Sequence, residues 1–157
     1  MKKKIFQSIL STTTIILLVS LTLITVVLHN YFQKIQNRQL REELALAALG
    51  VEQEGINYLS DLEQQNNRIT WIDSDGSILF DNKADIMKME NHSDREEFIE
   101  AVESGEGSSL RHSNTLTENT FYEAKLLADN TVLRISMNQK SVLALLLGLI
   151  QPFGMIL

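Results

Sequence analysis

The 157-residue sequence has no cysteine, a single proline at position 152 and no acidic residue before Glu42. Without cysteine the chain can form no disulfide, which suits an exported domain that avoids oxidation but excludes no compartment. Without an earlier proline, no helix or strand before position 152 is broken by one. All 20 Asp and Glu lie between His29 and Ser141, so acidic charge is confined to the middle of the chain.

That middle segment is strongly acidic. It carries 11 Lys and Arg against 20 Asp and Glu, a net charge of −9. Such a charge argues against nucleic acid and anionic lipid as its partners. About 110 residues are enough for one hydrophobic core and no more.

The N-terminal end is apolar. Ile5–Leu28 contains 24 residues without a charge, which as a helix exceeds the ~30 Å hydrocarbon core of a bilayer. Lys2 to Lys4 precede this run, so we expect residues 1–4 to stay in the cytoplasm. A cleaved signal peptide is the alternative, but its apolar core is usually ~7–15 residues and ends in small residues. The sequence therefore predicts an uncleaved transmembrane helix over residues 5–28.

The C-terminal end is also apolar but shorter. Residues 142–157 form a run of 16 residues, below the ~20 that a spanning helix needs. We expect the start of a second transmembrane helix and a chain that is the N-terminal piece of a longer protein. A complete protein with a partly inserted tail is the alternative. With two spans, residues of about 29–141 lie outside the cytoplasm.

Residues 29–67 are predicted to continue the first span as a helical stalk. Leu40, Leu44, Ala47 and Val51 fall on one helical stripe, and Gly55 can end the helix. The stripe can pack on the sheet of its own domain, on the same helix of a second subunit, or on both at different heights along the helix. The second interpretation makes these four residues the candidate seam of a homodimer.

A β-hairpin opens the next region. Ile69–Asp73 and Ser77–Phe80 flank Asp75 and Gly76, which supply the positive-φ chemistry of a tight turn. Asp73 and Asp75 resemble the start of a calcium loop, but its twelfth position is Ala84 where an EF-hand needs glutamate. The three histidines also lack metal-ligand spacing. We expect no metal ligand.

A helix and three strands complete the region. Ser93 and Glu96 form a capping box, so we expect a helix from Ser93 that ends at Gly105. Its predicted inward face consists of three apolar residues, and its glutamates are predicted to face water. The inward residues are Phe98, Ile99 and Val102; the glutamates are Glu96, Glu97, Glu100 and Glu103. The predicted strands are Ser108–Ser113, Thr120–Leu127 and Thr131–Ser136, with a turn at Asp129 and Asn130 between the last two.

This order and five sequence words are similar to one family. The words are RITWIDSDGSILFD, MENHSDREEFIEA, GEG, LRHSNTL and NTVLRIS. With them the chain resembles the extracytoplasmic sensor region of Gram-positive membrane histidine kinases of the phosphate-regulon type. The sequence departs from the family pattern at Asn130, where Gly is usual, and at Phe121, where Tyr is usual.

The resemblance implies an α+β fold, a PAS-like (PDC/Cache) antiparallel sheet with a long N-terminal helix. Two transmembrane helices flank it, the second truncated, and the sheet domain covers residues 68–136. The implied function is signal sensing and transmembrane signalling in a two-component sensor histidine kinase. Its ATP-dependent phosphotransferase region, through which it would meet a response regulator, is not in these residues. The alternatives are the sensor of a chemoreceptor or cyclic-dinucleotide enzyme, or a stand-alone membrane interaction protein.

A ligand pocket in such a fold lies between the sheet and the helix that covers it. Convergent cations there could hold a small anionic ligand by charge-assisted bonds. The alternative is that each arginine pairs with a nearby acid, for example Arg95 with Asp81 or Asp85, and that no ligand binds. We expect no catalytic residue and no cofactor in these residues. The candidate ligand-binding residues are His92, Arg95, Arg111, Tyr122 and Arg134.

Overall fold

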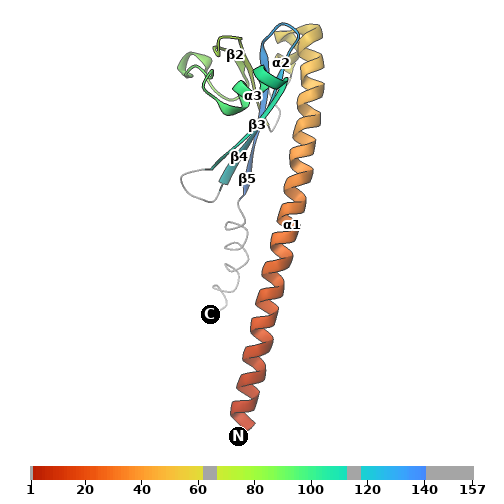
Figure 1. Cartoon of the computed structure of the whole chain (residues 1–157), viewed down its shortest axis with the longest axis vertical. Coiled ribbons are helices and arrows are strands. Elements are labelled where there is room, and N and C mark those ends of the chain that lie inside the picture. The colour runs from red at the N-terminus through yellow and green to blue at the C-terminus, as the bar shows by residue number, and fades with distance from the viewer. Residues whose placement is uncertain (1, 62–66, 113–117, 141–157) are drawn as a thin grey trace.

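The structure, a computed structural model, describes residues 2–61, 67–112 and 118–140. A long helix stands beside a small sheet and extends far past it toward the N-terminus (Figure 1). This confirms the predicted α+β fold with a long N-terminal helix and an antiparallel sheet. In chain order the elements are α1 (Lys2–Glu54), α2 (Ile56–Asp61), β1 (Arg68–Ile72), β2 (Ile78–Asp81), η1 (Ile86–Lys88), α3 (Glu96–Ser104), β3 (Glu106–His112), β4 (Glu118–Leu126) and β5 (Val132–Lys140).

Helix α1 is unbroken over 53 residues. In its apolar part each threonine hydroxyl donates a hydrogen bond of 2.9 Å to the carbonyl four residues earlier, as Thr12 does to Ser8 and Thr22 to Leu18. These bonds satisfy the hydroxyls inside the helix, so they add no unmet polarity to its surface. The helix ends where predicted, because Gly55 takes the left-handed conformation with φ 61°.

The apolar stripe of α1 packs on the sheet of its own subunit. Leu40, Leu44, Ala47 and Val51 are only 1–4% exposed and belong to one core with strand residues such as Leu133. Side chains covered in this way are not available to a second subunit. Of the two predicted roles for the stripe, the structure has the intrasubunit one, and the dimer-seam interpretation of these four residues is corrected.

The sheet has the strand order β2-β1-β5-β4-β3, and every neighbouring pair is antiparallel. The predicted turns are confirmed, because Gly76 has φ 85° and Asn130 has φ 66°. All five predicted strands are present, but β5 continues to Lys140 instead of ending at Ser136. Its extra length is paired with the beginning of β4, where Thr120 lies opposite Asn138.

Alternation along the strands divides the sheet into two faces. On the α1 side, Ile69, Leu133 and Ile135 are fully buried in the core that the stripe completes. On the α3 side a smaller cluster contains Ile72 and Phe98. The smaller cluster leaves room for polar side chains between α3 and the sheet.

Helix α3 differs from its prediction in two respects. It begins at Glu96 after Arg95, whose side chain makes no capping bond, so the capping box at Ser93 is wrong. The Ser93 backbone N–H instead donates to the Asn91 side chain. The inward face is also rotated: Phe98, Ala101 and Glu97 are buried, whereas Ile99 and Val102 are 44% and 46% exposed. The predicted end is confirmed, since Gly105 caps the helix with φ 91°.

The predicted second span, residues 142–157, lies outside the described residues.

Candidate functional site

A buried carboxylate occupies the centre of the α3 side of the sheet. Glu97 in the first turn of α3 has no exposed surface. Arg111 on β3 donates to both of its oxygens at 2.6 Å, Arg134 on β5 donates to Oε1 at 3.0 Å, and the Ser109 hydroxyl donates to Oε2 at 2.6 Å. Burial alone raises the pKa of Glu97, but the bonds from Ser109, its own backbone and Arg111 outweigh that effect and lower it. The carboxylate is therefore held ionised.

Arg134 extends the network across the sheet. Its side chain is 3% exposed, and its second guanidinium nitrogen donates to Thr70 Oγ1 on β1 at 3.2 Å. Thr70 in turn donates to Asp81 on β2 at 2.8 Å, and Arg68 donates to the same carboxylate at 2.9 Å. A continuous series of polar contacts thus joins α3 to the two strands at the far edge of the sheet.

Tyr122 lies beneath the arginines. The guanidinium carbon of Arg111 is 4.2 Å from the centre of the Tyr122 ring, and that of Arg134 is 5.2 Å from it. Both distances are within the range of cation–π attraction. The ring on β4 therefore supports the two cations that hold Glu97.

His92 and Arg95 border this cluster from the loop before α3. His92 is 8% exposed, and its backbone N–H donates to Gly76 O at 2.8 Å. Three buried nitrogens here have no hydrogen-bond partner: His92 Nδ1, Arg95 Nε and Arg134 Nε. The Arg95 Nε does lie 3.5 Å from Asp94 Oδ1 as an ion pair, but it makes no hydrogen bond. The two arginine nitrogens leave donor capacity in a region that already holds Glu97.

Burial and cationic neighbours keep His92 neutral. Burial, Arg134 and Arg95 lower its pKa to about 4, Arg68 adds to the effect, and Glu97 opposes it. In the unfolded chain His92 takes up a proton near pH 6.5, whereas in the fold it does so only near pH 4. Stability linked to His92 is therefore complete above pH 6.5 and is lost as the pH falls toward 4.

We expect the loss of unfolding free energy linked to His92 to reach about 2 kcal/mol. This is part of the value obtained when the whole pKa shift is converted at ~1.4 kcal/mol per unit. His92→Gln removes the titrating group and should flatten the decline. The measurement is the unfolding free energy at pH 7, 5 and 4 for both proteins. An equal decline in both would assign the acid sensitivity to other groups.

The loop before α3 is also hydrogen-bonded to the β1–β2 turn and packed against it. Asn91 donates from its side-chain amide to Asp75 O at 2.9 Å and accepts from the Ser93 N–H at 2.8 Å. Gly76 lies so close that an added Cβ would meet the Asn91 side chain and the Ser93 backbone. These contacts fix the position of the loop that carries His92 over the sheet.

All five candidate residues predicted from the sequence lie around this one side of the sheet. Arg111, Tyr122 and Arg134 are in direct contact with one another or with Glu97, and His92 and Arg95 flank them. Arg95 pairs with a nearby acid, as the alternative predicted, but the acid is Asp94. The two example partners are wrong, because Asp81 is bonded to Arg68 and Thr70, and Asp85 pairs with Lys88. Sequence reasoning missed the acceptors themselves. The missed acceptors are Glu97 and Thr70, and the Ser109 hydroxyl that donates to Glu97 was missed as well.

The arrangement is a carboxylate-binding site that the protein fills with its own Glu97. Two guanidinium groups and a hydroxyl bind one carboxylate, as they could bind the carboxylate or oxoanion of a ligand. Within residues 2–61, 67–112 and 118–140, no group of three or more His, Asp or Glu could hold a metal ion.

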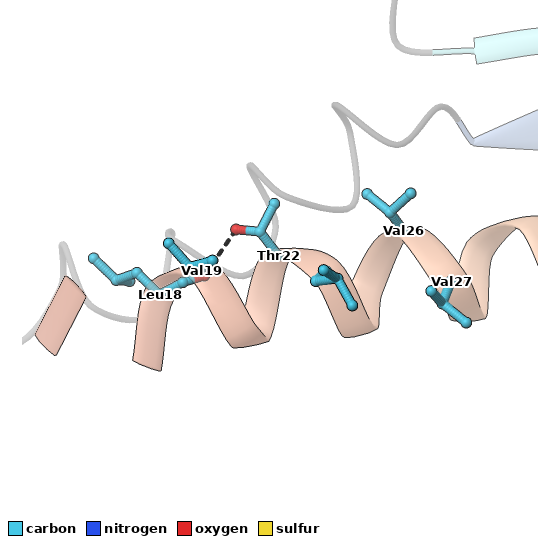
Figure 2. A pocket seen from close by; sticks show the side chains of 6 residues that line it. Leu18, Val19, Thr22, Val26 and Val27 are labelled. Carbon is cyan, nitrogen blue, oxygen red and sulfur yellow. Dashed lines mark hydrogen bonds between the residues drawn. The ribbon is translucent and has the colours of Figure 1, made fainter. Parts of the chain in front are cut away.

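A second, apolar feature lies far from this site on α1. A hollow of about 530 Å³ runs along residues 18–27 of the helix, and Figure 2 shows Leu18, Val19, Thr22, Val26 and Val27 around it. The Thr22 hydroxyl is bonded to the Leu18 carbonyl, so it adds no free polar group. The described residues of this lining suit lipid chains or another apolar helix, and among them Thr22 alone is polar.

The comparisons agree with this architecture. A family model described as Single Cache-like matches residues 29–133. The chain belongs to the single Cache-like family. No curated protein matches it.

A Cache domain indicates an extracellular sensor module of a signalling protein, and this one follows an apolar helix. Within the described residues, α1 alone is long and apolar enough to cross a membrane. Its most apolar window of 18 residues has a mean hydropathy of 2.2 and is entirely unburied.

Proposed function

We propose that this Cache chain is the sensing and membrane-crossing part of a two-component sensor histidine kinase. The observation that carries the proposal is the continuity of α1. The same helix is apolar and unburied in its first half and packs on the Cache sheet from Leu40 onward. A displacement of the sheet relative to this helix would reach the membrane without an intervening flexible joint. The resemblance of the five sequence words supports the kinase class.

The proposed orientation places Lys2 to Lys4 in the cytoplasm and the Cache domain outside. A lysine cluster beside an apolar span favours the cytoplasmic side. The acidic domain, with its net charge of −9, is on the opposite side of that span.

A small anion is the ligand class that the polar cluster suits. Arg111, Arg134 and Ser109 already bind a carboxylate, that of Glu97. An external carboxylate or oxoanion would have to displace Glu97 and with it α3. It could signal only by binding the displaced arrangement more tightly than the closed one.

A homodimer is the proposed assembly, but along a different face of α1 from the stripe. Leu46 and Leu49 point away from the sheet, on the side of α1 opposite the stripe, and are 66% and 56% exposed. Two such helices, one from each subunit, would cover these leucines. Signalling would then change how the paired helices sit.

Single cysteines in this cysteine-free chain can test the dimer in membranes. We expect oxidation to crosslink Leu46→Cys and Leu49→Cys between subunits, because these positions are exposed on the proposed seam. Leu44→Cys and Ala47→Cys should remain monomeric, since these positions are 3% and 4% exposed under the subunit's own sheet. The reverse pattern would return the seam to the stripe, and equal crosslinking at all four positions would exclude a defined seam.

The coding sequence beyond Leu157 decides the kinase class. We expect a dimerisation helix with a phosphorylatable histidine, followed by an ATP-binding region, and autophosphorylation of the full-length protein with ATP. A chemoreceptor signalling helix or a cyclic-dinucleotide synthase domain would overturn the kinase and leave the Cache sensor in place. A stop codon there would overturn both transducer classes.

A further inference from the structure

The contacts between α1 and the sheet change in character toward the membrane. The stripe residues Leu40, Leu44, Ala47 and Val51 make apolar contacts with the sheet. Nearer the apolar span, Gln139 at the end of β5 donates to Asn37 Oδ1 at 2.7 Å. One turn above, Arg41 donates to Glu123 Oε1 on β4 from Nη2 at 2.8 Å and from Nε at 3.3 Å. We call these four residues, Asn37, Arg41, Glu123 and Gln139, the polar junction.

Glu123 is the buried charged residue of the polar junction. Its side chain is 3% exposed, whereas that of Arg41 is 60% exposed. Glu123 on β4 lies opposite Ile135 of β5, which is fully buried. A carboxylate in this position depends on Arg41 for its counter-charge, while Arg41 can be hydrated without it.

The charged groups around Glu123 come from three elements. Arg41 on α1 favours the ionised carboxylate, whereas Glu106 on β3 and Glu100 on α3 oppose it. Burial raises the pKa of Glu123 more than the hydrogen bond and charge of Arg41 lower it, so the net shift is upward. Glu106 is itself 3.8 Å from Lys125, which moderates its influence.

We propose that Glu123 is a proton-binding site that releases the membrane-proximal part of α1 from the sheet. When a proton from the extracellular medium binds Glu123, the carboxyl becomes neutral and loses its ionic attraction to Arg41. Arg41 stays charged and turns to solvent. Asn37 and Gln139 are then the only polar pair of the junction that holds α1 to the sheet beside the apolar span. External acid thereby becomes an input to the membrane helix, a function beyond the proposed kinase class.

Acid weakens the Arg41–Glu123 contact of the polar junction but favours the fold as far as Glu123's own contribution to stability is concerned. Because the pKa of Glu123 is raised on folding, its ionised form disfavours the fold above that pKa, and this penalty disappears as the pH falls through it. Protonation therefore removes the free-energy penalty of the buried charge on β4, while it weakens the contact between α1 and the sheet. A loss of α1 contact caused by Glu123 is thus distinguishable from acid unfolding, which would disturb both together.

The test measures a distance across the polar junction in the full chain in nanodiscs. Nitroxide labels at Gln36→Cys on α1 and Leu110→Cys on β3 report the separation of helix and sheet. We expect a narrow distance distribution at pH 7.5 that broadens and lengthens at pH 5. Glu123→Gln should show the broad distribution already at pH 7.5 and no response to pH. A wild-type distribution that is the same at both pH values, or an equal acid response in Glu123→Gln, would overturn the proposal.

Infrared titration of the protonated carboxyl band gives a second, independent readout. The band that Glu123→Gln abolishes reports the midpoint of Glu123. Arg41→Gln should raise this midpoint by about one pH unit, because it removes the nearest cation. Arg38→Gln is the matched control: Arg38 lies on the same helix, 3.3 Å from Glu42, with its side chain 81% exposed, and should leave the midpoint unchanged. An unmoved midpoint in Arg41→Gln would contradict the site. Neither measurement needs an output domain, so failure of the kinase proposal leaves both interpretable.

Discussion

Replacing Glu97 by glutamine is expected to cost the domain about 3–5 kcal/mol of unfolding free energy, the range for breaking a buried ion pair from one side. The glutamine amide can occupy the same space, but it leaves Arg134, 3% exposed, without a counter-charge. Arg111 is 35% exposed and can recover part of its hydration. The dominant cost is therefore the uncompensated charge of Arg134.

Thermal or chemical unfolding of the full chain in detergent, followed by the fluorescence of Trp71, measures this cost. Glu96→Gln is the matched control, because Glu96 is the preceding residue of the same helical turn and is exposed. It should change stability by less than about 0.5 kcal/mol. A cost below ~1 kcal/mol for Glu97→Gln would mean that the arginines are solvated and that the cluster is not a closed site.

The same position tests the proposed ligand class. In Glu97→Ala the guanidinium groups and the Ser109 hydroxyl lose their carboxylate and leave space for another. Acetate or phosphate should raise the melting temperature of this variant above the rise that chloride gives at equal ionic strength. The wild-type protein should show no such difference while Glu97 fills the site. No anion effect in Glu97→Ala would exclude a small carboxylate or oxoanion as the ligand.

The two buried glutamates lie on opposite faces of the sheet. The stability that each contributes is expected to change with pH in opposite directions. Glu97 receives three side-chain donors, and its pKa is lowered, so its ionised form contributes stability that is lost when the pH falls through that pKa. Glu123 has one partner, Arg41, and its pKa is raised. Ionised Glu97 stabilises the fold, whereas the protonation state of Glu123 is the one that we propose changes with external pH.

The sheet could be predicted from the sequence because its signals are local. Alternation of apolar and polar residues marks β1, β4 and β5, and Gly76 and Asn130 mark two turns that need positive φ. The same alternation placed Tyr122 and Arg134 on the sides where the structure has them. The end of β5 was missed because Asn138 and Gln139 are polar, and their strand conformation comes from pairing with the start of β4.

The site could be predicted only in part because its acceptors are set by distant residues. Glu97 has the same local pattern as the exposed Glu96 and Glu100, which predicted a water-facing glutamate. Its actual environment comes from Arg111 and Arg134, which lie 14 and 37 residues further along the chain. Three cations in one region require an acid among them, but the sequence offered too many acids to identify which one.

Two of the words that carried the family resemblance now have physical explanations. In the word MENHSDREEFIEA, Asn91 holds the β1–β2 turn, and His92 is buried beside Arg134 and Arg95. In the word GEG, Gly105 ends α3 with a positive φ, while Gly107, the second residue of β3, lies directly under the helix. Both words fix the placement of α3, the element that carries Glu97.

Substitution of Gly107 is therefore the second change that we expect to cost much unfolding free energy. An alanine Cβ at this position would collide with the backbone carbonyl of Glu97 and lie 2.7 Å from the backbone nitrogen of Ala101. Neither atom belongs to a flexible side chain, so α3 must lift from β3 as a unit. Overpacking of this kind usually costs up to ~3 kcal/mol, and we expect Gly107→Ala to reach about 3 kcal/mol because both obstacles are backbone.

The lifted helix should also disturb the carboxylate site, which separates this variant from an ordinary core defect. In Gly107→Ala, Glu97 moves away from Arg111 and Arg134, so acetate should raise the melting temperature as it does in Glu97→Ala. Ser108→Ala is the matched control, because Ser108 is the next residue on β3 and its side chain is exposed. It should change neither stability nor the response to acetate. A stable Gly107→Ala protein that does not respond to acetate would show that α3 tolerates the added methyl group without releasing Glu97, and would contradict the close fit of α3 on β3.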